Sequence, residues 1–298
     1  MAKLYSALLV LSLIWGTSFL FIKILLESFD PYAVVFGRSL FGALILLMIV
    51  LVKKEKLVIK NIPKRPLLFV ALMNNVIPWL FICTSETKIS SGLASIINAT
   101  TPIWTLVIGF FIFSAKLRKN QWVGVLVGFI GIFILSEIRP GNYFSDNLLG
   151  VVLMSCATFC YGMGSHLTKK YLANLSILEI SFYTLAMSTV ISFAVMLMVS
   201  PKSVPEFLHI SLLWPFFGLG ALGSGIAYLL YYFLVQKGGP EFSSLVTYLA
   251  PVSAILWGAL LLKETIHLTM ILGLGVIFLG VYISSFKMKA KSDKEAAA

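Results

Sequence analysis

The chain has 298 residues, of which 59% are hydrophobic and 12% are charged, and its formal net charge is +11. A soluble domain carries about 25% charged residues. A water-soluble fold is therefore excluded, because too few polar side chains are present to cover its surface.

Ten apolar segments follow one another along the chain and leave no soluble domain between them. Several have the ~20 residues that a helix needs to cross ~30 Å of hydrocarbon, so we predict an all-α membrane protein with ten transmembrane helices. The first segment is too long for a signal peptide and is expected to remain as a span. In chain order the segments are Leu4–Leu26, Ala33–Val52, Leu67–Cys83, Leu93–Ser114, Trp122–Ser136, Leu148–His166, Ile177–Val199, Leu212–Val235, Leu245–Leu262 and Leu268–Phe286.

Lysine and arginine residues are distributed unevenly between the segments that connect these helices. With a cytoplasmic N-terminus, 17 of the 23 lie on the cytoplasmic side, five lie on the outer side, and Arg38 lies within the second helix. This asymmetry follows the positive-inside rule. We therefore predict a multi-pass protein of the cytoplasmic membrane with both termini in the cytoplasm. Because orientation explains the positive charge, we expect the lipid bilayer and a small-molecule substrate as partners, and no nucleic acid.

Two prolines lie inside apolar segments, where an interior proline costs a soluble helix roughly 3 kcal/mol. Pro102 in "TTPIWTLVIGFF" and Pro251 in "LAPVSAILWGAL" are 149 residues apart. At this offset three glycine pairs also coincide, and at an offset of 146 "WGTSFLFIK" lies over "YGMGSHLTK". The coinciding glycines are Gly109 with Gly258, Gly124 with Gly273, Gly131 with Gly280 and, at the second offset, Gly16 with Gly162.

This self-similarity predicts a duplicated chain. We assign residues 1–139 and 140–286 to two five-helix repeats and residues 287–298 to a basic cytoplasmic tail. Since five is odd, the second repeat must enter the membrane with the opposite orientation, an architecture typical of secondary transporters with alternating access. We interpret Pro78, Pro102 and Pro251 as helix bends. The bends at Pro102 and Pro251 either line a central cavity or are harmless kinks, which membrane helices tolerate.

The segments "IWGTSFLFIK" and "DPYAVVFGRSLFGALIL", with the paired blocks ending "GVLVGFIGIFIL" and "GLGVIFLGVYI", resemble EamA-type members of the drug/metabolite transporter superfamily. The resemblance covers essentially the whole chain. It implies ten helices, cytoplasmic termini, a cavity between the halves, and export or exchange of small metabolites such as amino acids. Members often have Gly-Glu after the fourth and ninth helices. Here those positions read Ser114-Ala115 and Lys263-Glu264, which puts any role for a matched pair of acids in doubt.

Charged residues are rare within the spans. All twelve acidic residues fall near span ends, in loops or in the tail, so a proton relay based on carboxylates is not supported. His166 is then either a proton carrier or a hydrogen-bonded histidine. Arg38 is the strong charge within a span, and it either anchors the helix or attracts a substrate carboxylate.

Uncharged polar and aromatic residues within the spans are better candidates for a binding cavity. Buried amides need hydrogen-bonding partners, so they should face the protein interior or a wet cavity. Tyr228, Tyr231 and Tyr232 either face the cavity or belong to an interfacial aromatic belt, and the interfacial alternative is stronger for Tyr231 and Tyr232 than for Tyr228. The cavity candidates are Trp15, Thr17, Asn74, Asn75, Trp79, Asn98, Thr101, Tyr161, His166, Tyr228 and Tyr248.

We therefore predict a secondary transporter that exports or exchanges small metabolites, amino acids above all. A multidrug efflux carrier and a non-transporting scaffold are the alternatives. The spans carry no cluster of His, Asp, Glu or Cys, and no nucleotide-binding loop is present, so we expect neither an enzyme nor an ATP-driven pump. The three cysteines form no metal-binding pattern, and we predict no cofactor and no metal. The sequence does not distinguish a monomer from an oligomer.

Overall fold

The computed structural model describes residues 2–54, 57, 62–116, 118–135, 146–209 and 213–285. Within this part of the chain, eight helical segments are long and apolar enough to cross a membrane, and two shorter apolar helices accompany them. The prediction of an all-α membrane protein is confirmed. The fifth predicted segment is indeed short, since its helix has 17 residues.

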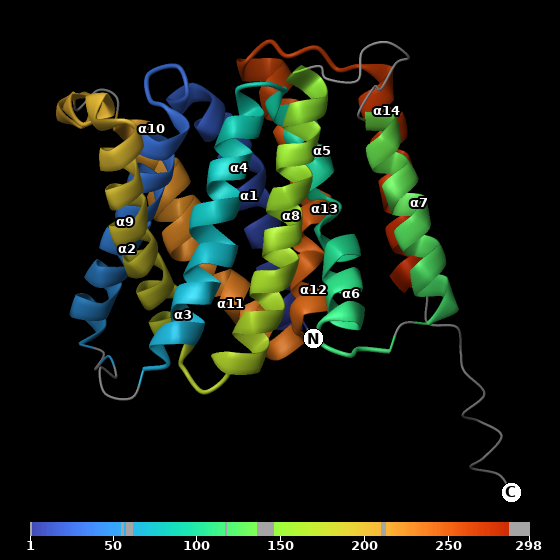
Figure 1. The fold of residues 1–298 in the computed structure, drawn as a ribbon, viewed down its shortest axis with the longest axis horizontal. Helices are drawn as coiled ribbons and strands as arrows, with labels where there is room; N and C mark the ends of the chain where they lie inside the picture. Colours follow the sequence, from blue (N-terminus) through green and yellow to red (C-terminus); the bar gives the residue numbers. More distant parts are fainter. Residues whose placement is uncertain are drawn as a thin grey trace, which may run out of the picture.

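Figure 1 shows the helices as one bundle. The first half consists of α1 (Ala2–Leu25), α2 (Pro31–Lys53), α3 (Lys64–Ala71), the π-helix η1 (Leu72–Val76), α4 (Ile77–Glu86), α5 (Ser91–Asn98), α6 (Thr101–Phe111) and α7 (Lys119–Leu135). The second half consists of α8 (Asp146–Tyr171), α9 (Ile177–Val199), η2 (Pro201–Ser203), η3 (Pro205–Leu208), α10 (Trp214–Phe216), the π-helix η5 (Phe217–Ile226), α11 (Ala227–Gly238), α12 (Pro240–Ser244), α13 (Val246–Leu261) and α14 (Leu268–Ser285).

The two halves run through the bundle in opposite directions. A Cβ atom on Gly280 of α14 would lie 2.6 Å from the carbonyl oxygen of Gly124 of α7, and one on Gly131 would lie 3.1 Å from that of Gly273. Gly124 thus contacts Gly280, and its counterpart in the repeat, Gly273, contacts Gly131. This exchange is expected of two antiparallel helices related by a two-fold axis. Small residues at such a contact allow two helix backbones to approach closely.

The first helix of each half packs in the same way against the fourth span of the other half. The Cβ position of Gly16 in α1 falls on Ser253 of α13, and that of Gly162 in α8 lies 3.1 Å from the backbone nitrogen of Thr105 in α6. Gly16 and Gly162 were aligned at the offset of 146. Their matching environments show that the aligned glycines mark equivalent helix contacts in the two halves.

The helix irregularities also recur in both halves. The third span of each half contains a π-helix, η1 in the first and η5 in the second, and the fourth span of each is divided into two helices. The predicted bends differ in detail. Pro102 lies in the first turn of α6, where the missing amide hydrogen costs nothing, whereas Pro78 follows the π-helix η1 directly, inside the continuous span Lys64–Glu86. Pro251, in contrast, lies inside α13, and the interruption of that span comes earlier, at Leu245.

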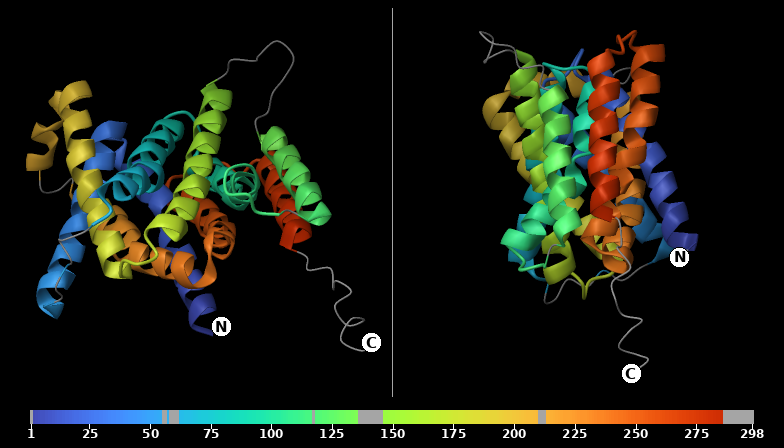
Figure 2. Two further views of the ribbon diagram at one scale, coloured as in Figure 1. Left: turned by 60° about the horizontal axis from the view of Figure 1, so that its bottom comes forward. Right: turned by 90° about the vertical axis from the view of Figure 1, so that its right-hand side faces the viewer.

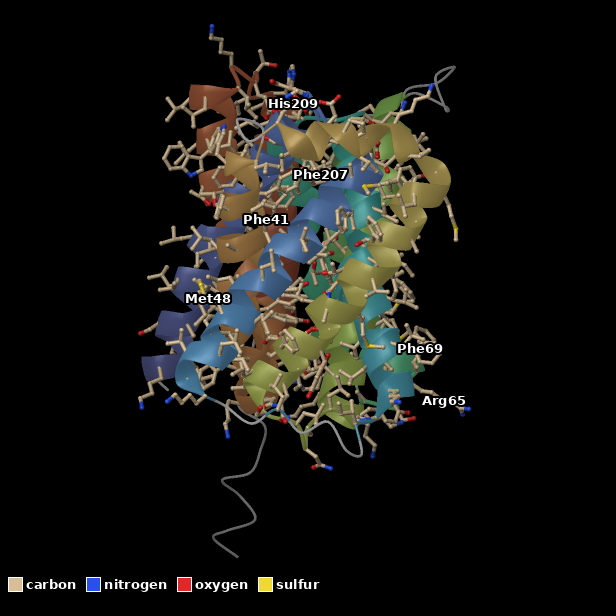
Figure 3. The ribbon with its side chains drawn as sticks, turned by 90° about the vertical axis from the view of Figure 1, so that its left-hand side faces the viewer. Phe41, Met48, Arg65, Phe69, Phe207 and His209 are labelled. Carbon is tan, nitrogen blue, oxygen red and sulfur yellow. The ribbon has the colours of Figure 1, made fainter. Side chains whose placement is uncertain are left out.

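The bundle presents an apolar surface to its surroundings. In Figure 3, Met48 and Phe69 project outward, whereas Arg65 and His209 lie at opposite ends. Met48 is 54% exposed and Phe69 56% exposed, as side chains that face lipid must be. The start of α1 and the end of α14 lie at the same end of the bundle (Figure 1). Which end faces the cytoplasm remains a prediction from the charge distribution.

The α7–α14 pair stands at one side of the bundle, as Figure 1 and the left view of Figure 2 show. We expect Gly280→Leu to destabilise the protein by about 1–3 kcal/mol, because its side chain would meet backbone atoms of α7. Gly275→Leu is the matched control, since no heavy atom lies within 4 Å of its Cβ position. Thermal unfolding in detergent should show a lower melting temperature for Gly280→Leu only. Equal melting temperatures for the two variants would contradict the packing described here.

Candidate functional site

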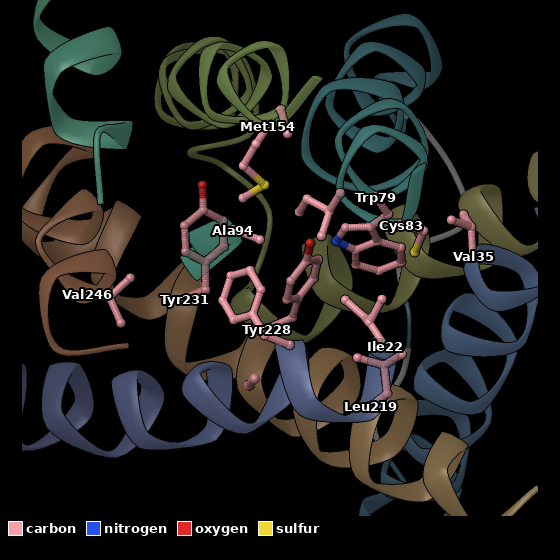
Figure 4. Packing of buried hydrophobic residues seen from close by; sticks show 14 of the residues in the cluster. Ile22, Val35, Trp79, Cys83, Ala94, Met154, Leu219, Tyr228, Tyr231 and Val246 are labelled. Atoms are coloured by element: carbon pink, nitrogen blue, oxygen red, sulfur yellow. The ribbon is translucent and has the colours of Figure 1, made fainter. Parts of the chain in front are cut away.

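A cavity lies between the two halves, where helices from both contribute side chains. It is enclosed by α1, α2, α4, α8 and α11 and by the interrupted spans α5–α6 and α12–α13. Figure 4 shows part of its wall, with Trp79, Tyr228, Tyr231 and Ile22 close together. The lining residues are Trp15, Ser18, Phe19, Ile22, Arg38, Trp79, Ile82, Asn98, Thr101, Tyr161, Ser165, Tyr228, Tyr231, Ser243, Ser244, Val246 and Thr247.

The lining follows the internal repeat. At the offset of 146, Trp15 corresponds to Tyr161 and Phe19 to Ser165, and all four line the cavity. The offset of 149 relates Trp79 to Tyr228, Ile82 to Tyr231 and Asn98 to Thr247, and these also line it. The cavity therefore surrounds the pseudo-two-fold axis between the repeats, where a solute can be reached from either end by equivalent movements of the two halves.

Arg38 breaks this symmetry, because Thr184 occupies the corresponding position at the offset of 146. The Arg38 side chain is 4% exposed, and it is the one charged group among the described lining residues. Its Nε donates a 2.7 Å hydrogen bond to Ser224 Oγ. The guanidinium carbon lies 4.1 Å from the ring centroid of Trp79, a cation–π contact. The guanidinium is thus oriented by two neighbours at the cavity wall.

Aromatic side chains from α1, α4 and α11 form another part of the cavity wall. Trp15 Nε1 donates a 3.0 Å hydrogen bond to the carbonyl oxygen of Gly223, and the Tyr228 hydroxyl donates a 2.8 Å bond to the carbonyl oxygen of Asn74. The ring centroids of Trp79 and Tyr228 are 5.9 Å apart. Because the polar atoms of Trp15 and Tyr228 are bonded to backbone, these two rings offer the cavity flat, fixed surfaces.

The interrupted spans supply the polar part of the lining. Asn98 ends α5, and Thr101 begins α6 and donates a 2.7 Å hydrogen bond to the Asn98 carbonyl oxygen. The Oδ1 atom of Asn98 is buried and has no hydrogen-bond partner among the described residues. On the other side, Ser244 and Thr247 flank the break before α13. A solute in the cavity therefore meets amide and hydroxyl groups near both breaks, with Asn98 Oδ1 left for it to bond.

Several candidates from the sequence lie elsewhere. Thr17 bonds to the Ile14 carbonyl of its own helix, and Asn75 donates a 2.7 Å bond to Ser188 in α9. Asn74 donates a 3.4 Å bond to Thr168 and supports Tyr228 from behind through its carbonyl oxygen. His166 Nε2 lies 3.0 Å from the Thr105 carbonyl oxygen, as expected of a hydrogen-bonded histidine. Tyr248 lies in α13, but its side chain is outside the described part of the structure.

Of the two alternatives for Tyr231 and Tyr232, the interfacial one is contradicted by their burial. Tyr231 is 6% exposed and lines the cavity, and Tyr232 is fully buried. The Tyr232 hydroxyl lies 3.2 Å from Thr184 Oγ1 on α9. Both tyrosines face inward because α11 packs against α1 and α9 rather than lying at the edge of the bundle.

Sequence reasoning missed a group of small polar residues that line the cavity. Ser243 and Ser244 precede the predicted ninth span and were not considered. Their signal is their place shortly before Thr247, which corresponds to Asn98 at the offset of 149. The missed lining residues are Phe19, Ile22, Ile82, Ser165, Ser243, Ser244, Val246 and Thr247.

Glu264, which follows α13, joins the two halves at one end of the bundle. Its carboxylate accepts hydrogen bonds from the backbone nitrogen and the hydroxyl of Ser91, both at 2.8 Å, and from the backbone nitrogen of Gly92 at 3.2 Å. These groups form the N-terminus of α5, where an anion is favoured by the unpaired N–H groups and the helix dipole. Glu264 therefore ties the end of the ninth span to the start of the fourth.

The cavity in this structure is small, with a volume of about 50 Å³. Typical ligand pockets enclose roughly 300–1,000 Å³, so the helices must separate before a metabolite can enter. Within the described residues, no three His, Cys, Asp or Glu side chains are placed to hold a metal ion.

Comparison with known proteins identifies the chain. The pattern of the EamA-like transporter family matches residues 2–137 and 148–286, one match in each half. The chain belongs to the EamA-like transporter family. It is therefore a multi-pass membrane transporter with duplicated halves, and not an enzyme.

Relatives of this EamA-like transporter extend over nearly its whole length. The "Uncharacterized inner membrane transporter YedA" of Escherichia coli K12 is 29% identical over 94% of this chain and 90% of its own. The "Uncharacterized transporter YoaV" of Bacillus subtilis is 21% identical over 96% of this chain and 98% of its own. One crystal structure of a protein with 15% identity superposes with a TM-score of 0.71, covering 96% of this chain and 97% of that one. That likeness shows a shared fold.

Proposed function

We propose that this EamA-like transporter exports or exchanges small metabolites that carry a carboxylate, amino acids above all, by alternating access through the central cavity. The observation that carries this proposal is Arg38. No hydrogen bond from its Nη atoms to a described residue is found, and the guanidinium lies at the cavity wall. A carboxylate can accept two parallel hydrogen bonds from such a group, which is among the stronger polar contacts in proteins.

The rest of the lining suits the other parts of an amino acid. Trp15, Trp79 and Tyr228 give apolar surface for a side chain, and their contact with one another leaves little freedom to rearrange. Asn98 Oδ1 is an acceptor without a partner, which matches an ammonium group. A cationic drug would instead be repelled by Arg38, so the cavity favours a metabolite over the compounds of a multidrug carrier.

The duplicated architecture supports alternating access. Equivalent spans are interrupted in the two halves, and both interruptions border the cavity. A break in a helix lets its two parts move separately, and an inverted repeat makes the opening at either end structurally similar. We place the protein in the inner, cytoplasmic membrane, with both termini in the cytoplasm, since the charge asymmetry favours this orientation.

The test is counterflow in proteoliposomes that contain the purified protein and are preloaded with one unlabelled solute at a time. Labelled amino acids and their amides, in which the carboxylate is replaced by a neutral group, should be compared at equal pH on both sides. We expect one or a few amino acids to exchange and their amides to be at least about tenfold poorer, since a hydrogen bond to a charged group contributes about 1.5–3 kcal/mol. Equal exchange of acid and amide would contradict the role of Arg38.

A further inference from the structure

Glu86 is a buried carboxyl group that the proposed binding cavity does not use. It is the last residue of α4 and is fully buried. Neither carboxyl oxygen has a hydrogen-bond partner among the described residues. An ionised carboxylate in such surroundings is very costly unless it is paired. Glu86 lies at a span end in the sequence, where an exposed, ionised side chain is expected. The packing around α4 instead buries this side chain.

Glu264, a second acid at the same end of the bundle, differs from Glu86 in its hydrogen bonds. Glu264 accepts three hydrogen bonds from Ser91 and Gly92, so its negative charge is stabilised by donors. Glu86 lies five residues before Ser91 and has no such donors. Two nearby carboxylates repel each other, and the one with fewer donors keeps the proton. The geometry therefore assigns the charge to Glu264 and the proton to Glu86.

Lys23 might be expected to neutralise Glu86, yet its ammonium group is bonded elsewhere. Lys23 Nζ donates to the backbone carbonyl oxygens of Glu86, at 2.6 Å, and of Ile89, at 3.1 Å. It thus completes the C-terminal end of α4, where free carbonyl groups and the helix dipole favour a cation. The lysine is held by backbone atoms, and the Glu86 carboxyl group is left without a bonded cation.

The other elements packed around α4 add few charges. Besides Lys23 from α1, the charged groups that act on Glu86 are Arg38 from α2 and Glu264 from the segment after α13. Its own helix contributes Cys83, and α8 contributes Tyr161 near that cysteine. α5 carries no titratable residue. Arg38 lies at the cavity wall, with its Nε bonded to Ser224 and its guanidinium over Trp79, and it makes no hydrogen bond to the Glu86 carboxyl group in the described structure.

We propose that Glu86 is a proton-binding site: its carboxyl group is protonated in this closed form, and it exchanges the proton with water when the end of the bundle held by Glu264 opens. Opening would admit water to Glu86 and stabilise the carboxylate. Closing would require the carboxylate to take up a proton from that water first. Proton uptake and closure of this end are therefore linked.

This linkage, which rests on the proposed transport function, couples the movement of substrate to protons. Ile82 lies one turn before Glu86 and lines the cavity, so a proton held at Glu86 is separated from the substrate space by about one helical turn. Whenever the site is closed, the carboxyl group is neutral and carries one proton. The presence of the proton site itself does not depend on which solute is transported.

Infrared spectroscopy of the full-length protein in lipid tests the site directly. We expect the carbonyl band of a protonated carboxyl group at neutral pH in the wild type, and its loss in Glu86→Gln. Glu27→Gln is the matched control, because Glu27 is an exposed acid at the same end of the bundle, and it should keep the band. Gln resembles a neutral carboxyl group in shape, so Glu86→Gln should fold. An identical spectrum in the wild type and Glu86→Gln overturns the proposal.

Transport assays test the coupling separately. Under the proposal, Glu86→Gln keeps counterflow at equal pH but no longer accumulates solute when a pH difference is imposed. The wild type and Glu27→Gln should accumulate it, up to about tenfold per pH unit for one proton per substrate molecule. A Glu86→Gln variant that accumulates solute as the wild type does overturns the coupling. A wild type with the infrared band but no counterflow of any amino acid counts against the proposed substrate and leaves the proton site standing.

Discussion

Replacing Arg38 with glutamine will weaken the binding of carboxylate substrates by roughly 10–100-fold. The guanidinium is the one charged group among the described cavity-lining residues, and hydrogen bonds to charged groups contribute about 1.5–3 kcal/mol. Glutamine can still donate a hydrogen bond to Ser224, so the packing of α2 against η5 should persist. The measurement is the half-saturating concentration of the transported amino acid in counterflow, at matched protein content.

The same variant distinguishes the two roles that the sequence allowed for Arg38. If Arg38 binds the substrate carboxylate, the amide of the substrate will be exchanged about equally well by the wild type and by Arg38→Gln. If Arg38 only anchors its helix, exchange of acid and amide will fall together and the melting temperature will drop with them. Arg38→Lys keeps the charge but not the planar fork of the guanidinium, so it should restore part of the affinity.

Replacing Glu264 with glutamine will open the end of the bundle that this residue closes. The carboxylate accepts three hydrogen bonds at the start of α5, and a neutral amide cannot accept all three without turning its own N–H groups toward donors. With a loss of about 1.5–3 kcal/mol, the equilibrium between closed and open forms should shift by roughly 10–100-fold.

Cys83 is a native reporter of this opening. It is fully buried one turn before the end of α4, whereas Cys156 is exposed. With Cys156 and Cys160 replaced by alanine, a water-soluble thiol reagent should modify Cys83 slowly in the wild type and at least about tenfold faster in Glu264→Gln.

The opposite end of the bundle supplies a matched control. Ser114 and Lys263 both have positive φ angles, 57° and 56°. The residue after Ser114, Ala115, donates its backbone N–H to the carbonyl oxygen of Gly109. In the same way, the residue after Lys263, Glu264, donates its backbone N–H to the carbonyl oxygen of Gly258. The two loops thus have the same backbone, but Ala115 stands where Glu264 does in the other half. Ala115→Ser should leave the Cys83 rate unchanged. An unchanged rate in Glu264→Gln as well would show that its carboxylate does not hold the cavity closed.

The inverted repeat could be predicted because its signals are local. The length of each apolar segment fixes a span, and glycines in register, such as Gly124 with Gly273, report on close helix contacts. The structure shows these glycines at the α7–α14 contact. The bends were predicted less well. Pro102 and Pro251 are aligned in sequence, yet one begins a helix and the other lies within one, because a buried proline is tolerated wherever neighbouring groups satisfy the freed carbonyl.

The candidate site could be predicted only in part. Asn75 and Asn98 are equally polar within apolar segments, but Asn75 faces α9 and bonds to Ser188, while Asn98 faces the cavity. Tyr231 looked like an interfacial residue and instead forms part of the wall. Hydropathy does not tell which way a side chain points around its helix when neighbours cover every face.

The sequence alone is enough to predict a membrane protein with ten helical segments in two related halves and with aromatic and amide groups inside them. These are properties of single helices and of their spacing along the chain. Three further facts follow only from the folded structure: Arg38 faces the cavity, Glu264 caps α5, and Glu86 is buried with no hydrogen-bond partner for its carboxyl group among the described residues. Each of those facts depends on contacts between residues that are far apart in the chain, and the free energy of a charged group is set by those contacts.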